Sequence, residues 1–129
     1  MHGPVRSNTK ILIENHGIRQ IKGEAHRRWF SSKDLDLIVW YDLDGSPMEF
    51  QLCYSTGPVR RALTWTRARG FRHEDIDDGE DVAGAHKMTP LLFADGKYDL
   101  GHILDLFENQ SCNIEQEIKS FVIAKLTDA

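Results

Sequence analysis

The sequence feature that most constrains the fold is a pair of β-rich runs, residues 35–41 and 48–54, separated by Asp44-Gly45. An Asp-Gly between two such runs is the strongest short-range signal for a β-hairpin. With Asp44 and Gly45 as the loop, the cross-strand pairs are Tyr41 with Met48, Val39 with Phe50, Leu37 with Leu52, and Leu35 with Tyr54. A slip of one residue would set each of these side chains opposite a more polar neighbour, so the pattern fixes the register.

The other face of the predicted hairpin is mixed, because it carries acidic, amide and apolar side chains together. It comprises Asp36, Ile38, Trp40, Asp42, Glu49, Gln51 and Cys53. Residues 61–67 alternate with period two, so that Leu63 and Trp65 continue the core face while Thr64 continues the mixed face. Further β-rich runs at 10–23, 24–31 and 87–93 extend this meander to between four and six strands. For residues 10–23, two short strands, one broken strand, or a helix over 9–16 all remain open.

Two amphipathic helices close the chain. The first follows Asp99 as N-cap, and the second follows Asn113, with Gln116 completing a capping box. Their apolar stripes are Leu100, Ile103, Leu104 and Phe107, then Ile114, Ile118, Phe121, Val122 and Leu126. Strands first and helices last predict an α+β domain: an antiparallel β-meander with two C-terminal helices packed on one face. We expect this domain to span residues 10–129, after a flexible lead-in over residues 1–9.

Composition narrows the function classes. The 129 residues fit one domain, and the net charge of −4 with a pI of about 5.8 disfavours a nucleic-acid or anionic-membrane partner. No run approaches the length of a membrane span, and the N-terminus lacks the apolar segment of a signal peptide. The two cysteines, Cys53 and Cys112, have no metal-site spacing, so we expect reduced thiols in a cytoplasmic protein with no metal and no cofactor.

The mixed face is the preferred candidate for a binding site. We expect Ile38 and Trp40 to be exposed there, because two helices on the opposite face cannot cover them. The protein is therefore predicted to be a non-enzymatic binding or interaction domain that meets a protein partner or forms a homodimer through this face. The predicted binding residues are Trp40, Asp42, Glu49, Gln51, Thr64 and Arg67.

Two alternatives from other function classes stay open. The first is a small hydrolase that uses carboxylates with His73 or His86, although no catalytic residue is identified from spacing. The acidic loop 74–81 fails the calcium-loop template, so a solvated loop is the preferred interpretation. The second is anion or nucleic-acid binding through arginines in the region 60–72, where internal charge balancing is the simpler explanation.

Several segments together resemble a family of small bacterial conserved proteins of unknown function. They are residues 27–30, 36–40, 50–54, 61–65 and 77–80, and the resemblance covers about residues 27–126. The family brings no known activity, cofactor or catalytic residue. The resemblance implies only a bacterial stand-alone domain.

Overall fold

The structure, a computed structural model, describes residues 9–56, 59–76, 87–90 and 100–128. Its strands are β1 (Ile13–Glu14), β2 (Arg27–Ser31), β3 (Leu35–Tyr41), β4 (Pro47–Thr56), β5 (Val59–Thr66), β6 (Gly70–Ile76) and β7 (Lys87–Pro90). Its helices are α1 (Leu100–Gln110) and α2 (Gln116–Asp128).

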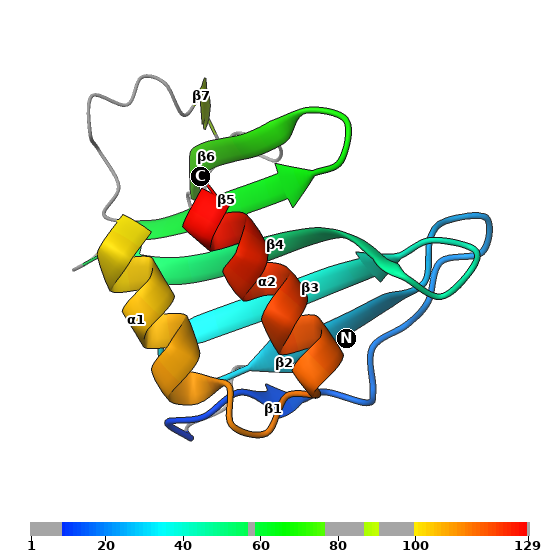
Figure 1. Ribbon diagram of the computed structural model, residues 1–129, viewed down its shortest axis with the longest axis horizontal. Helices are drawn as coiled ribbons and strands as arrows, with labels where there is room; N and C mark the ends of the chain where they lie inside the picture. The colour runs from blue at the N-terminus through cyan, green and yellow to red at the C-terminus, as the bar shows by residue number, and fades with distance from the viewer. Residues whose placement is uncertain (1–8, 57–58, 77–86, 91–99, 129) are drawn as a thin grey trace.

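The described residues form one antiparallel sheet in which every strand pairs with its sequence neighbours, in the order β1 to β7. Figure 1 shows α1 and α2 side by side across one face of this sheet. The α+β meander with two C-terminal helices is thus confirmed. Of residues 10–23 only the two-residue β1 is a strand, and the remainder of that segment consists of turns, bends and irregular backbone. The predicted lead-in, apart from Thr9, lies outside the described residues.

The register of the central hairpin is confirmed over most of its length, since Leu35, Leu37 and Val39 pair as expected with Tyr54, Leu52 and Phe50. The pairing of Tyr41 with Met48 is wrong. Tyr41 pairs instead with Pro47, and the register shifts between Trp40 and Tyr41.

The turn itself explains this shift. The Gly45 N–H donates to the Asp42 carbonyl at 3.0 Å, and the Asp42 N–H donates to the Ser46 carbonyl at 2.8 Å. Gly45 has a φ of +89°. Three residues, 43–45, therefore form the loop, with glycine in the left-handed position. The longer loop moves the pairing by one residue, and Met48 becomes the extra residue of a bulge.

The core lies between the sheet and the two helices. Phe50 is fully buried at its centre, and its ring lies 5.8 Å from that of Phe121, 6.2 Å from Phe71 and 6.3 Å from Trp65. Both predicted helix stripes face this core. Their fully or nearly fully buried members are Ile103, Phe107, Ile114, Ile118, Val122 and Leu126. Burial of aliphatic and aromatic groups from both layers is the main force holding helices to sheet.

The second helix begins later than the Asn113 cap predicts. Residues 111–114 form a turn in which the Ile114 N–H donates to the Ser111 carbonyl at 3.0 Å. The first intrahelical bond runs from the Lys119 N–H to the Glu115 carbonyl at 3.0 Å, so Glu115 occupies the N-cap position. Ile114 is buried before the helix starts, which moves the cap two residues along the chain. The Asp99 cap lies outside the described residues.

Within the described segments, no helix has the length and apolar character that crossing a membrane requires.

Candidate functional site

The sheet face opposite the helices is built from cross-strand rows. One row, well away from the β3–β4 turn, has five members on the neighbouring strands β2 to β6. It consists of Ser31, Asp36, Cys53, Ala62 and Glu74, each directly opposite the next. All five are buried, although two of them are acidic. The centre of this row is therefore closed to a docking partner, whereas Ile13, opposite Ser31 on β1, and Ser55, beyond Cys53 on β4, are exposed.

The negative charge of Asp36 in this closed row is balanced by an arginine on β5. The Arg60 guanidinium donates to the Asp36 carboxylate at 3.0 Å. Burial raises the pKa of the neighbouring Cys53 thiol to about 11, and the Asp36 charge acts in the same direction. Since the thiolate is the nucleophile, Cys53 is unreactive at neutral pH. One carboxylate oxygen of Asp36 has no hydrogen-bond partner. The hydroxyl of Ser31, which lies opposite Asp36, has none either.

The middle row of the same face contains two of the predicted binding residues. The Gln51 side-chain amide donates to the Thr64 hydroxyl at 2.9 Å, so these two groups satisfy each other. Ile38 lies between Trp29 and Gln51 in this row and is only 6% exposed. The expectation that Ile38 is exposed is wrong, because the large side chains beside it shield it from water.

The row nearest the hairpin turn is the most open of the three. Arg27, Trp40, Glu49 and Thr66 lie opposite one another across β2 to β5, and all are half-buried. Just beyond this row, the Arg67 guanidinium donates to the Asp42 carboxylate at 2.9 Å. Exposure therefore increases from the buried row to the hairpin row, and four of the six predicted binding residues lie at the hairpin end.

A cleft opens at the same end. It has a volume of about 580 Å³ and lies between residues 23–26 and the β3–β4 hairpin. Its lining residues are Gly23, Glu24, Ala25, His26, Tyr41, Asp42, Leu43 and Met48. Figure 1 shows the hairpin tip and the preceding loop projecting together beyond the ends of the helices. A cleft of this size, with apolar walls and a few polar groups, is the usual form of a ligand site.

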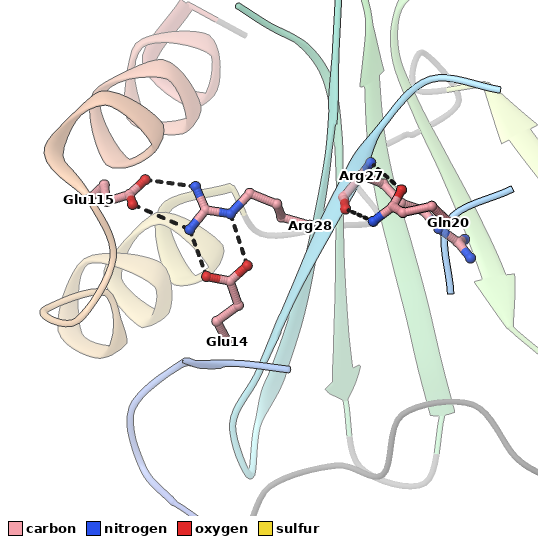
Figure 2. A network of polar contacts seen from close by, with 5 residues as sticks. All are labelled: Glu14, Gln20, Arg27, Arg28 and Glu115. Atoms are coloured by element: carbon pink, nitrogen blue, oxygen red, sulfur yellow. Dashed lines mark hydrogen bonds and ion pairs between the residues drawn. The ribbon is translucent and has the colours of Figure 1, made fainter. Parts of the chain in front are cut away.

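The cleft wall formed by residues 23–26 is anchored to β2. The Gln20 side chain accepts from the Arg27 N–H at 3.0 Å and donates to the Arg27 carbonyl at 2.7 Å. Figure 2 shows the Gln20 amide bonded to the backbone N–H and carbonyl of Arg27, as a neighbouring strand would be. The Arg27 guanidinium also donates to the Arg19 carbonyl at 2.9 Å. A turn at Gly23, with a φ of +88°, then leads the chain back to β2.

Arg28, the next residue of β2, connects this strand to the helix layer. Its guanidinium donates to Glu14 at 2.6 and 2.9 Å and to Glu115 at 2.7 and 3.3 Å (Figure 2). These contacts join β1, β2 and the start of α2. The hydrogen bond from Arg28 lowers the pKa of Glu14, and Arg28 lowers that of Glu115 in the same way. Both carboxylates are consequently ionised at neutral pH.

The cleft floor combines an aromatic pair with an ionised carboxylate. The His26 and Tyr41 rings lie 5.9 Å apart and are tilted by 52°. Burial raises the pKa of Tyr41, whereas the hydrogen bond from Arg67 lowers the pKa of Asp42. At neutral pH the cleft therefore contains a neutral phenol and a negative Asp42.

The histidines and arginines singled out from the sequence do not converge on one site. His73 faces the helices, where its Nε2 lies 2.6 Å from the Tyr54 hydroxyl, so it does not join Asp42 or Glu49. His86 lies outside the described residues, as does most of the acidic loop 74–81. Arg60 and Arg61 are consecutive strand residues and point to opposite faces. Arg60 and Arg67 both form ion pairs within the chain, so the arginines do not gather into one basic patch.

Sequence reasoning missed Glu24, His26 and Tyr41 as site residues. Their proximity depends on how the loop before β2 folds back against the hairpin, and no hydrophobic period reports such a contact. The Lys22-Gly23 pair is a local turn signal, and it would have indicated the reversal of the chain but not its destination.

Among the described residues, no group of three or more His, Cys, Asp and Glu side chains is arranged to hold a metal ion. Comparison of the chain with protein-family models, with curated proteins and with solved structures found no match to any of them.

Proposed function

We propose that this protein is a binding domain that contacts a partner protein through the hairpin end of its sheet. The contact surface comprises the cleft together with Trp40, Asp42, Glu49 and Arg67. The observation that carries the proposal is the cleft itself, which opens beside a leucine that is completely exposed, Leu43. Nothing in the described fold requires an apolar side chain at that tip.

The distribution of exposure supports the same surface. The closed row of the helix-free face is buried, whereas the hairpin row is half-buried and rimmed by the Asp42–Arg67 ion pair. A large apolar side chain and a half-buried tryptophan surrounded by charged groups resemble the centre and rim of protein interfaces. Gln51 and Thr64 have a supporting role in this proposal, because their polar groups are already paired with each other.

Site-specific photo-crosslinking tests the proposal. A photoreactive amino acid replaces Leu43 in one variant and Ile13 in the control, because Ile13 on the edge strand β1 also has an exposed aliphatic side chain. We expect one discrete adduct from position 43 and none from position 13. The purified partner should then bind the unlabelled protein, and Leu43→Ser should weaken that complex about tenfold.

The outcomes separate the versions of the proposal. An adduct between two copies of the chain, with a concentration-dependent dimer in sedimentation, identifies the partner as a second copy. An adduct with another protein identifies a heterologous partner. Equal capture from positions 13 and 43, or a complex that is unaffected by Leu43→Ser, would overturn the proposed surface.

A further inference from the structure

The charged side chains among the residues that line the cleft are negative. Glu24 and Asp42 both contribute carboxylates to its lining, and none of the lining residues is lysine or arginine. Arg67 reaches Asp42 from the rim, at 2.9 Å. Arg28, on the far side of Tyr41, is already engaged by two carboxylates. The whole chain adds a net charge of −4. A positively charged group is thus the electrostatically favoured occupant.

The residues in the walls of the cleft indicate which shape of positively charged group would fit. The Tyr41 and His26 rings present aromatic surface, and Met48 adds a polarizable thioether. A flat cation gains from stacking on such rings while its edge hydrogen bonds to a carboxylate. The arginine guanidinium is flat, weakly hydrated and forked, whereas the lysine ammonium is compact and strongly hydrated.

We infer that the cleft receives an arginine side chain of the partner protein, an inference that rests on the function proposed above. The guanidinium lies against the Tyr41 and His26 rings and donates to Glu24, whose carboxylate is exposed at the opening. Leu43 contacts the partner's apolar residues beside that arginine. The exposed leucine favours a polypeptide over a small metabolite, because it lies at the rim and adds contact area outside the cleft.

Peptide titrations test this inference with the whole protein. The probes are three short peptides that carry arginine, citrulline or lysine between two leucines. Citrulline has nearly the shape of arginine but no charge. Amide shifts of Ala25, His26, Leu43 and Met48 in two-dimensional NMR spectra report binding. We expect the arginine peptide to bind about tenfold more tightly than the citrulline peptide, with the lysine peptide between them.

Two matched variants locate the interaction. Glu24→Gln should reduce affinity for the arginine peptide several-fold and leave the citrulline peptide unchanged. Glu108→Gln removes an equally exposed carboxylate from α1 and should change neither. Equal binding of arginine and citrulline peptides, or equal effects of the two variants, would overturn the inference. The crosslinking result at position 43 is independent of these titrations, so the proposed function can stand when the arginine inference fails.

Discussion

Arg28 is the residue on which most polar contacts between separate elements converge. Its guanidinium joins Glu14 on β1 to Glu115 at the start of α2, and it lies 5.3 Å from the centre of the Phe30 ring. The hydrogen bonds to both carboxylates raise the pKa of Arg28, so it remains charged at any pH at which the protein is folded. Paired arginine–carboxylate bonds of this kind are among the stronger polar contacts in proteins.

Replacing Arg28 by methionine should destabilise the fold. The substitution retains an apolar stem but leaves the mostly buried Glu14 carboxylate without its partner. We expect a loss of about 2 kcal/mol in the free energy of unfolding, measured by urea titration. Arg67→Met is the control, because its ion pair with Asp42 is solvent-exposed and should contribute nothing measurable. Equal losses in the two variants would contradict the role given to Arg28.

The loss of stability in the Arg28→Met variant should also depend on pH. The folded-state pKa of Glu14 is lowered from its ordinary value of 4.5, primarily by the hydrogen bond from Arg28. The ionised form therefore stabilises the native state above about pH 4.5, and this contribution disappears as the pH falls through the folded-state pKa. The gap in stability between the wild type and Arg28→Met should accordingly narrow as the pH falls below about 4.5.

At the scale of the element, the β3–β4 hairpin illustrates how far local sequence determines structure. The alternation of apolar residues predicted the partners of Leu35, Leu37 and Val39 correctly. The Asp44-Gly45 signal placed the turn correctly but did not reveal its length. A two-residue and a three-residue loop are both compatible with that dipeptide. The bulge at Met48 follows from the three-residue loop, and it brings the Met48 side chain to the cleft.

Gly45→Ala should destabilise the hairpin. Gly45 has a φ of +89°, and nothing lies within 4 Å of where a Cβ would stand, so the cost comes from backbone conformation alone. We expect a loss of about 1 kcal/mol, seen as a lower melting temperature. Gly17→Ala is the matched control, because Gly17 has no positive φ and its added Cβ would make only an ordinary contact of 3.4 Å with Asn15. A variant at position 45 as stable as the one at position 17 would contradict this account of the turn.

At the scale of the whole molecule, the helix-free face of the sheet has a buried row across its middle strands and a more open row at the hairpin end. The helices cover one face, and the closed row on the other face buries Asp36 and Cys53. The cleft lies at the hairpin end of the sheet. A rigid sheet that presents its binding groups at one end is a common way to hold a site on loops without disturbing the core.

Thiol labelling should distinguish the buried Cys53 from the exposed Cys112. Cys112, in the connection between the helices, is exposed, whereas Cys53 is 7% exposed and has a pKa of about 11. A thiol reagent at neutral pH should modify Cys112 at once, and Cys53 only at the rate at which the sheet opens. Both thiols should react together in strong denaturant. Rapid modification of Cys53 in the native protein would show that the closed row is accessible.

Short-range patterns in the chain were sufficient to predict several strands and both helices. Period-two alternation identified β3, β4 and β5, and apolar stripes identified the buried sides of both helices, because those periods follow from backbone geometry. It also placed Trp40, Asp42, Glu49 and Arg67 near one another, since consecutive antiparallel strands carry their partners across known pairs.

The exposure of each of those groups, and the contacts between them, depend on the three-dimensional arrangement of the elements. Ile38 is buried because of the side chains that flank it, and His73 faces the helices because its pairing with Leu63 sets its side. The cleft exists because hydrogen bonds between Gln20 and Arg27 anchor the loop before β2 to that strand, and residues 23–26 then lie beside the hairpin. These are contacts between segments without a shared period, so their energies depend on three-dimensional placement and leave no local signature in the chain.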